Sequence, residues 1–433
     1  MRNYPKALKR KLLDTICQMR EELPKYTANP KRDFTWNRKL PFETLCRTIL
    51  LMSGQSLNVE LQRQFHYDPA AATTSAFVQQ RGKLLPTTFE EILRRFTYQN
   101  RPIRKWNGYT LLAADGSHVQ IPSDIYDKAT YFNSTQDGRG YNLLHLNALY
   151  DLESQLYLDA IIQDGREEHE SQALVEMVDR SELTESVILI ADRGYEAYNN
   201  MAHIEQKGWK YLIRVKDKQG ILSGLRLPDA LEFDAVFSYF LSKRLTKRIR
   251  QEPQKYRWIP SKVHFDYIGD ASDALYPISF RVVRFAVKEG LYETVITNLP
   301  ADQFPPPLLR ELYHKRWGIE TSFRDLKYTL ALTHFHAKKR PFIKQEIFSR
   351  MTLYNFASLL RLHAAFTQPE GKHFYHINTA FAAHIAREFL LGFVLAAKVE
   401  PLIAKFLLPV RPGQQKPRNM RVKRPISFQY RMI

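Results

Sequence analysis

The spacing of apolar residues divides the chain into helix-forming and strand-forming regions. Over residues 1–100 the apolar positions recur at helical spacing, and residues 41–65 predict two helices separated by a turn at 53–56. Ser56 is suited to cap the second of these helices, because its side-chain oxygen can accept from the first-turn backbone. A further helix is predicted to begin at Thr74 or Ser75. Helices around a short turn resemble a helix-turn-helix, although any helical bundle makes such turns.

From about Trp106 the pattern changes to strands. Residues 108–122 predict a strand followed by a turn, further strands are predicted at 141–164 (two strands joined by a turn at 151–154), 185–192 and 209–217, and helices at 169–183 and 198–208. The first strand is predicted to end in a turn at Asp115. A strand, a hairpin and then alternating helices and strands form a mixed α/β layer. This order matches an RNase H-like core, in which a three-stranded meander precedes the helices.

The second half interrupts and then completes this core. Residues 218–290 predict a strand-rich insertion, a strand follows near 293–300, and one long helix is predicted over 305–330. We therefore expect an α/β protein with helical ends. The predicted domains are a helical DNA-binding domain (1–100), the first part of the core (106–217), the insertion (218–290), the second part of the core (291–340), and a helical C-terminal region (341–433) whose last 23 residues form a basic arm.

Charge indicates the kind of partner. The chain has 64 Lys and Arg against 45 Asp and Glu, a net charge of +19. Such an excess favours a polyanion, and nucleic acid is the commonest one. An anionic membrane surface is the alternative, but no run of about 18 apolar residues is present. The most apolar stretch, from Phe389, is predicted as a buried helix, and the N-terminus lacks the apolar segment of a signal peptide.

Cysteine usage excludes two further classes of protein. Cys17 and Cys46 are the only cysteines, and no CxxC or Cys/His cluster is present. A disulfide framework and a thiolate zinc site are both excluded. The composition is typical of a protein of the reducing cytosol.

Candidate chemistry begins with the sequence YHKRWGIETSFRDLK at 313–327. Tyr313, Arg316 and Glu320 are spaced at i, i+3 and i+7 and share one helix face, and Lys327 lies two turns beyond Glu320. A carboxylate between two cations is suited to hold a metal while the cations hold phosphates. A solvated helix with i,i+4 ion pairs is the alternative.

Two aspartates follow apolar strands. Asp115 comes after LLAA and Asp192 comes after VILIA, where polar groups project from the end of a strand. Each is also compatible with a turn or helix-cap residue. Together with Glu320 they account for a single site, because three carboxylates can hold two Mg²⁺ ions about 3.5–4 Å apart. Mn²⁺ is a possible substitute for Mg²⁺. Such a pair supports in-line displacement at phosphorus by water or a 3′-hydroxyl.

Other polar residues near these acids have simpler interpretations. His118 is close enough to Asp115 in the sequence to approach the metals, but it is interpreted as a strand histidine with its own hydrogen-bond partner. Glu170, with its acidic neighbours, is interpreted as a helix N-terminus favoured by the dipole rather than as a catalytic group. Arg193 is suited either to contact phosphate or to orient Asp192. Trp317 and Phe323 are predicted to face the core.

The ordered set of motifs resembles a known family. Asp115 in DGS, Asp192 in ADRGY and Glu320 resemble the DDE triad of insertion-sequence transposases. The spacing of Tyr313, Arg316, Glu320 and Lys327 resembles the YREK signature of the IS4 family, to which the Tn5 and Tn10 transposases belong. Glu320 lies 128 residues after Asp192, as an insertion between them requires.

The resemblance implies further roles. Tyr313, Arg316 and Lys327 would grip backbone phosphates while the strand ends form a hairpin. Tyr292, or failing that Trp258, would receive a base flipped from the stack. The resemblance also implies cut-and-paste movement, recognition of terminal inverted repeats and target DNA, a homodimer that synapses two element ends, and a bacterial, nucleoid-associated protein of the cytoplasm.

Two other functions stay open at this stage. An RNase H-like metal-dependent nuclease would cut DNA without transposing it. A DNA-binding protein with a decayed catalytic site would keep the charge and the fold but lack activity.

Overall fold

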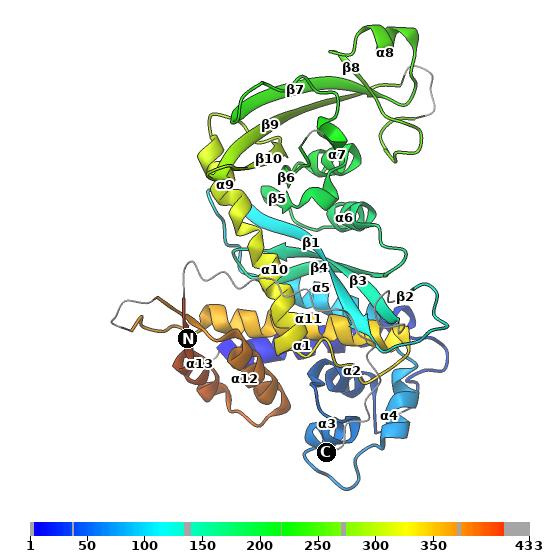
Figure 1. Ribbon diagram of the computed structural model, residues 1–433. Helices are drawn as coiled ribbons and strands as arrows, with labels where there is room; N and C mark the ends of the chain where they lie inside the picture. The colour runs from blue at the N-terminus through cyan, green and yellow to red at the C-terminus, as the bar shows by residue number, and fades with distance from the viewer. Residues whose placement is uncertain are drawn as a thin grey trace.

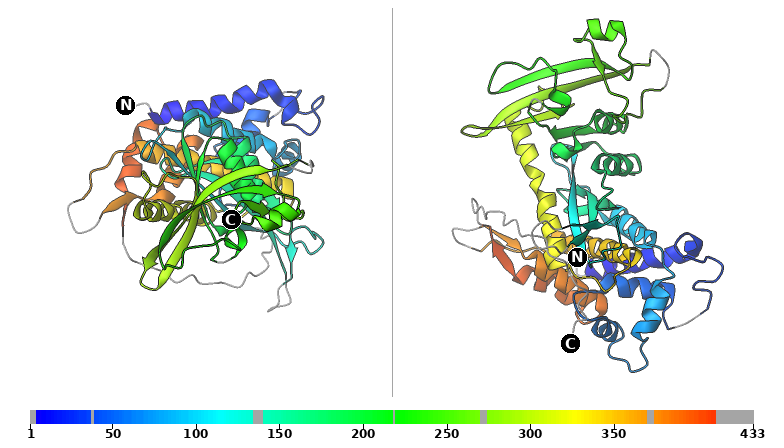
Figure 2. Two further views of the ribbon diagram at one scale, coloured as in Figure 1. Left: turned by 90° about the horizontal axis from the view of Figure 1, so that it is seen from above. Right: turned by 45° about the vertical axis from the view of Figure 1, so that its right-hand side comes forward.

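The protein is elongated, with its sheet-and-helix core between two different ends. A computed structural model describes residues 4–36, 39–133, 140–217, 219–269, 274–369 and 374–410. Long strands of the insertion form one end, and helices from both termini of the chain form the other (Figures 1 and 2). The helix pair α9 and α10 runs along the core from the first end to the second (Figure 1).

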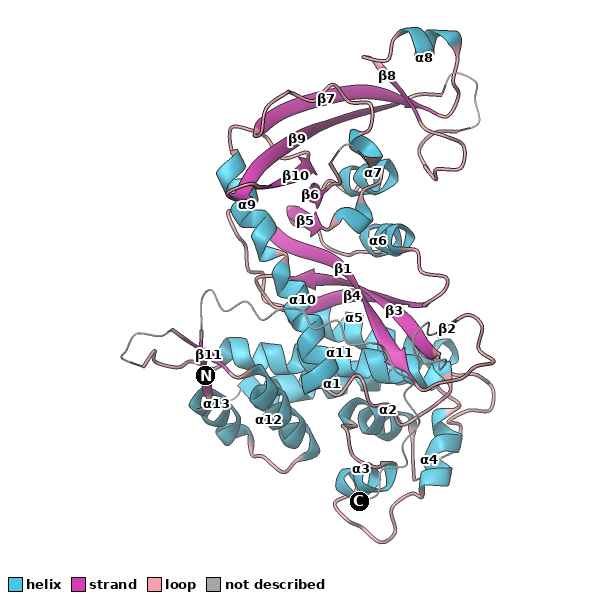
Figure 3. Cartoon of the chain, in the orientation of Figure 1, coloured by secondary structure: helices cyan, strands magenta, loops and turns pink. Residues whose placement is uncertain are grey.

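The helical end combines both termini in one apolar core. Helix α11 lies at its centre and packs against helices from the N-terminal and C-terminal regions (Figure 3). Ser56 caps α3 as expected, since its side chain accepts from the Val59 backbone. The helices are α1 (Tyr4–Met19), α2 (Phe42–Leu51), α3 (Leu57–Gln64), α4 (Thr74–Arg81), α5 (Thr87–Asn100), α11 (Arg340–His363), α12 (Thr379–Leu391) and α13 (Ala396–Lys405), with a 3₁₀ turn at Arg20–Lys25.

One ten-stranded sheet passes through the core and the insertion. Its strands run in the order β2-β3-β1-β5-β6-β10-β9-β7-β8, and β4 pairs with β3. The strands are β1 (Thr110–Ile121), β2 (Tyr131–Phe132), β3 (Tyr141–Asp151), β4 (Leu156–Asp164), β5 (Val187–Ala191), β6 (Lys210–Arg214), β7 (Phe233–Ser242), β8 (Tyr256–Trp258), β9 (Tyr276–Lys288) and β10 (Leu291–Thr297). Strands β11 (Tyr375–Ile377) and β12 (Leu407–Pro409) form a separate pair.

The predicted RNase H-like, mixed α/β fold class is confirmed. Strands β1, β3 and β4 form an antiparallel meander, and β5 and β6 then add in parallel beside β1. Helices α6 (Glu170–Asp179) and α7 (Tyr198–Gln206) cover one face, and α9 (Pro306–Lys315) and α10 (Trp317–Arg324) cover the other (Figure 1). Side chains alternate between the two faces along β1. Leu112 and Ala114 therefore pack into the core under α6, while Ala113 packs into the core on the opposite face of the sheet.

The insertion continues the core sheet. Strand β9 pairs with β10, and β7 pairs with β9, so the hydrogen-bonded ladder runs without a break from the core into the insertion. Helix α8 (Lys247–Gln251) and β8 lie at its outer end (Figure 1). The domain limits at 218 and 290 stay predictions. The ladder itself shows that core and insertion share one rigid element.

The long helix predicted over 305–330 is irregular. It is divided at Arg316, where i→i+3 hydrogen bonds tighten the backbone, and it continues past Arg324 as a π-helical turn at Asp325–Thr329. A π-turn lengthens the helix by one residue per turn and is frequent at functional sites. Lys327 lies in this turn, so its direction differs from that expected of a regular helix.

The apolar stretch from Phe389 does not form one buried helix, which corrects the prediction. Helix α12 ends at Leu391 because Gly392 adopts a left-handed backbone conformation, with φ of 96°. Phe393 and Leu395 after it are exposed. Within the described residues, no helix is long and apolar enough to cross a membrane. The predicted basic arm lies outside the described residues.

A buried ion cluster fastens the N-terminal helices to α11. Arg81 of α4 donates from Nη1 to Glu346 Oε1 at 2.9 Å, and Arg350 donates to the other oxygen at 3.1 Å. Burial alone would raise the pKa of Glu346, but Arg81, His336 and Arg350 outweigh it and hold that pKa well below its usual range. The cluster therefore stabilises the fold at neutral pH, and this contribution is lost as pH falls through the acidic range.

Glu346→Gln should reduce the free energy of unfolding by about 3–5 kcal/mol at pH 7, because it leaves two buried arginines without a counter-charge. Urea denaturation measures the change. The matched control is Glu43→Gln, which removes the partner of the exposed Arg20 and should cost less than about 1 kcal/mol. Equal losses in the two variants would contradict a structural role for the buried cluster.

Candidate active site

Two aspartates meet where strand β5 ends beside strand β1. The parallel ladder of β1 and β5 stops at Ala114 and Ala191. Asp192 then leaves the sheet, whereas Asp115 stays within β1, opposite Ala148 of β3. The prediction that Asp115 ends its own strand is therefore wrong. The neighbouring strand is the one that ends, and this opens the sheet beside the Asp115 side chain.

A buried arginine joins the first aspartate to the helix on the adjacent face. Arg316 places Nη1 3.3 Å from Asp115 Oδ2 and donates from Nη2 to Glu320 Oε1 at 2.7 Å. Its side chain is only 3 % exposed. Arg316 and Glu320 are an i,i+4 pair, so the helix itself presents both toward β1. Two acids 205 positions apart in the sequence thus contact one guanidinium.

The second aspartate has an arginine of its own. Arg214, the last residue of β6, donates from Nε to Asp192 Oδ1 at 2.9 Å and from Nη1 to Glu293 Oε1 at 3.2 Å. Glu293 belongs to β10, the strand next to β6. Neighbouring strands therefore fix the direction of Asp192 through this arginine.

The two aspartates line one small cavity of about 280 Å³. Glu170 supplies a third carboxylate to the same cavity. The sequence predicts this residue only at a helix N-terminus, and it is indeed the first residue of α6. The cavity lining is Asp115, Glu170, Asp192, Arg193, Gly194, Tyr195 and Lys216.

Two glycines make room for the Glu170 carboxylate. A Cβ atom on Gly116 would lie 2.7 Å from Glu170 Oε1, and one on Gly194 would lie 2.5 Å from Oε2. Gly116 directly follows Asp115 in DGS, and Gly194 lies two residues after Asp192 in ADRG. This pairing of acid and glycine was the available sequence signal for a third carboxylate approaching the backbone.

The electrostatics of the site oppose ionisation of its most buried acid. Burial raises the pKa of Asp115 to about 6, and the nearby charges of Glu320 and Asp192 add to that effect. Arg316 and the Gly116 backbone N–H act in the opposite direction. A site with this surplus of carboxylates is stabilised by added positive charge, and hard oxygen ligands are those that Mg²⁺ prefers. The residues present therefore fit a divalent metal.

Three buried polar atoms near the acids lack a partner within the part of the chain that the structure describes. Among the described residues, Tyr195 Oη, Tyr313 Oη and Arg316 Nε have no hydrogen-bond partner. Buried polar groups are rarely left unsatisfied, because their desolvation costs about 1–3 kcal/mol each.

The predicted phosphate-binding residues differ in exposure. Tyr313 is buried, with 4 % of its surface exposed, and burial raises the pKa of its hydroxyl to about 12. Lys327 donates to Ser117 of β1 at 2.7 Å. Arg193 is exposed at the mouth of the cavity. The structure thus brings Lys327 and Arg193 to the same region as the acids, and places Tyr313 beneath it.

The predicted aromatic residues divide into core and surface groups. Phe323 is buried as expected, but Trp317 is 53 % exposed, so the prediction that it faces the core is wrong. Its ring lies 5.4 Å from the Arg316 guanidinium. Tyr292 is the second residue of β10 and packs under Arg284 at 5.3 Å, whereas Trp258 lies at the outer end of the insertion. These two residues therefore belong to different regions.

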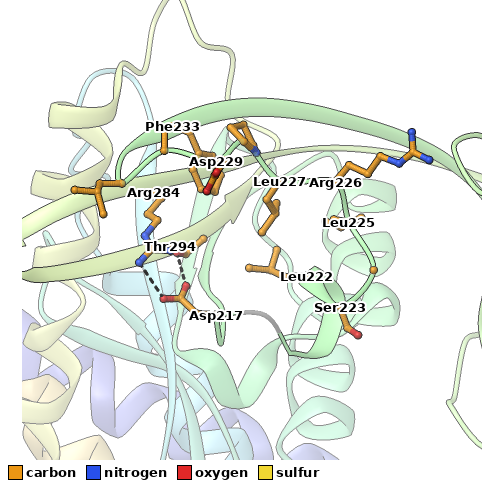
Figure 4. Close-up of a pocket in the computed structure, with 14 residues that line it drawn as sticks. Asp217, Leu222, Ser223, Leu225, Arg226, Leu227, Asp229, Phe233, Arg284 and Thr294 are labelled. Carbon is orange, nitrogen blue, oxygen red and sulfur yellow. Dashed lines mark hydrogen bonds and ion pairs between the residues drawn. The ribbon is translucent and has the colours of Figure 1, made fainter.

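A larger cavity of about 840 Å³ lies between the insertion strands and the segment after β6 (Figure 4). Asp217 accepts from Thr294 at 2.6 Å and forms an ion pair with Arg284 at 3.6 Å. Arg284 is also the residue over the Tyr292 ring. Arg284 thus lines the larger cavity and also contacts the Tyr292 ring.

A family model matches the part of the chain that holds the three acids. The family model described as the transposase DDE domain matches residues 106–356, which include β1, β5 and α10. No curated protein matches the sequence. Among solved structures, the chain is similar to a cryo-electron microscopy structure of the piggyBac transposase synaptic complex with hairpin DNA, at 10 % identity and a TM-score of 0.45, covering 96 % of this chain and 88 % of that one.

The family model spans more than half of the chain and includes all three predicted acids. The chain therefore belongs to the transposase DDE domain family, a family of metal-dependent enzymes that cleave DNA.

Proposed function

We propose that this chain is an IS4-family transposase that uses Mg²⁺ to cut DNA at the ends of its own element and to join them to a target. The observation that carries the proposal is the convergence of Asp115 and Glu320 on Arg316, with Asp192 lining the same cavity as Asp115. The three acids have the order and spacing of a DDE triad, and the family match includes them.

The three carboxylates would hold the metal. When bound, two Mg²⁺ ions, or Mn²⁺ in their place, would activate the attacking water or 3′-hydroxyl and stabilise the leaving oxygen. The chain itself would orient Asp115 and Glu320 through Arg316, and Asp192 through Arg214. These charge-assisted contacts fix the carboxylates before any DNA arrives.

Cations around the cavity would hold the DNA backbone. Lys216 and Arg193 are exposed and line the cavity, and Lys327 lies beside β1. Arg316 keeps an Nε donor without a partner, and Tyr313 keeps a hydroxyl. Phosphate oxygens satisfy such donors, which supports the interpretation of Tyr313, Arg316, Glu320 and Lys327 as an IS4-type signature.

The wider partner would be double-stranded DNA, held by two copies of the chain. A net charge of +19 favours a polyanion of this size. Cut-and-paste transposition brings two inverted ends together, and a symmetric dimer matches their symmetry. We propose that hairpin ends form during this reaction and that Tyr292 receives the flipped base.

Asp192→Asn and Glu320→Gln should each reduce excision by at least about 10³-fold, because several kcal/mol of metal-dependent stabilisation are lost. A plasmid marker bracketed by the DNA that borders this reading frame measures excision. Binding of the same DNA should persist. Asp302→Asn, an exposed acid away from the site, is the matched control.

Supplying pre-cut ends and a target plasmid separates the rival functions. A transposase yields joined product, whereas a nuclease yields only cleavage. DNA binding without Mg²⁺-dependent cleavage or joining in the unaltered chain would favour a decayed enzyme. Unchanged excision in Asp192→Asn would remove Asp192 from the site.

Asp115→Asn should stabilise the metal-free protein at pH 8 by on the order of 2 kcal/mol. The pKa of Asp115 is raised from 3.8 to about 6 in the fold. Because the folded state favours the protonated acid, Asp115 contributes to fold stability below its ordinary pKa, and this contribution is lost as pH rises through about 6. Asparagine mimics the neutral form, so the gain should disappear near pH 4.

Thermal unfolding with and without Mg²⁺ measures this effect. Saturating Mg²⁺ should raise the melting temperature of the unaltered chain at pH 8 more than that of Asp115→Asn, because a ligand stabilises the state that binds it. An Asp115→Asn protein that is less stable than the original at pH 8 in EDTA would contradict the inference that ionised Asp115 destabilises the metal-free fold.

Tyr292→Ala should slow hairpin formation by about 10-fold or more while leaving the first nick intact, since base stacking on an aromatic ring contributes about 1–3 kcal/mol. Tyr292→Phe keeps the ring and is the matched control. Single-turnover gels separate nick from hairpin. Equal slowing in both variants would assign the effect to the hydroxyl, and no slowing in either would remove Tyr292 from this role.

A further inference from the structure

A second group of metal-binding side chains lies next to the carboxylates. His118 of β1 and His145 of β3 are directly opposite one another, with ring centroids 5.0 Å apart. Glu168, from the loop before α6, places Oε2 2.9 Å from His118 Nε2 and 3.1 Å from His145 Nδ1. The three residues offer ligand atoms that lie within 4.8 Å of one another.

This group projects from a different face of the strand than Asp115 does. Side chains alternate along a strand, so His118 and Asp115, three residues apart, point to opposite faces. Gly116 is on the His118 face, and a Cβ atom added there would lie 2.4 Å from His145 Nε2, so only glycine leaves room for that ring. The side chains of His118 and Asp115 thus lie on opposite faces of β1, while Glu170 contacts both the histidine group and the cavity of the acids.

A neutral imidazole at His145 cannot hydrogen-bond to both of the carboxylates beside it. Its side chain is 4 % exposed, and its two nitrogens face two carboxylates, with Nδ1 3.1 Å from Glu168 and Nε2 3.2 Å from Glu170. Neither nitrogen makes a hydrogen bond of good geometry. A neutral ring has one N–H and one lone pair, so one carboxylate would face the lone pair.

We propose that His118, His145 and Glu168 form a site for a transition-metal cation, with zinc as the type. A cation at Nδ1 takes the lone pair of His145, and the remaining N–H at Nε2 donates to Glu170. A carboxylate that accepts from a ligating histidine is the usual outer support of such sites. Imidazole nitrogens favour zinc and similar ions, while Mg²⁺ favours the oxygen-only site.

The distances agree with this assignment. Ligand atoms at about 2.0 Å from a tetrahedral zinc ion lie about 3.3 Å from one another. The two distances from Glu168 Oε2, 2.9 and 3.1 Å, differ from this value by a few tenths of an ångström, and all three ligand atoms lie within 4.8 Å of one another. His118 and Glu168 are 39 % and 41 % exposed, so the fourth position faces solvent. The ion can therefore enter without unfolding the core.

Glu170 links this site to the cavity of the acids. One of its oxygens faces His145, and the other lies against Gly194, two residues after Asp192. Binding at the histidine site would fix the Glu170 carboxylate and so fix one wall of the neighbouring cavity. The inferred site is thus a support for the active site, built from different ligands.

Co²⁺ is the probe, because nitrogen ligation in a tetrahedral site gives visible absorption bands that Mg²⁺-type oxygen sites lack. Titration of the full-length protein should show one such site. Its affinity should fall at least about 100-fold in His118→Ala and Glu168→Ala, both exposed positions, and about 10-fold in Glu170→Gln. The matched control is His264→Ala, whose side chain is 80 % exposed and pairs with Asp266. Zn²⁺ should displace Co²⁺.

The measurement needs no DNA, so its result is independent of transposition. The double variant Asp192→Asn/Glu320→Gln should keep the Co²⁺ bands. Loss of the bands in that variant would assign the ion to the carboxylate site and overturn the proposal. No bands in the unaltered chain, or unchanged affinity in both His118→Ala and Glu168→Ala, would also overturn it.

Discussion

The guanidinium of Arg316, buried between Asp115 and Glu320, decides how the two halves of the core fit together. Carboxylates from β1 and α10 would repel one another if they met without a counter-charge in a partly desolvated site. With the arginine between them, the helix is held against the sheet at the point where the parallel neighbour of β1 ends. Arg316 Nε and the hydroxyls of Tyr195 and Tyr313, all buried nearby, have no hydrogen-bond partner among the described residues. Arg316 thus closes the fold and keeps a positive charge beside the acids.

The large-scale plan could be predicted from the sequence, because it follows from periodicity. Alternating strands, the order of helices and the interruption before β10 all leave patterns in the chain, and the RNase H-like class follows from them. The same patterns could not show that β1 continues past Asp115, since that depends on β3 remaining as a partner after β5 has stopped. Nor could they show the π-turn at Lys327 or the left-handed Gly392, which are set by local packing.

The three acids of the site could be predicted from the sequence, whereas several residues around them could not. Asp115, Asp192 and Glu320 are conspicuous because they follow apolar strands or stand between cations. Arg214 and Glu170 were not, because an arginine at the end of a strand and a glutamate at the start of a helix have ordinary explanations. Trp317 was assigned to the core from its size, yet it lies over Arg316 at the surface. Partners far apart in the sequence are known only once the strands are placed.

The unbroken ladder from β1 to β7 has a mechanical consequence. Because β9 is shared between the core and the insertion, the insertion cannot swing as a separate body without breaking backbone hydrogen bonds. Strand β9 has 13 residues and spans about 40 Å. Any contact that the outer end of the sheet makes is therefore held at a fixed distance from the acids.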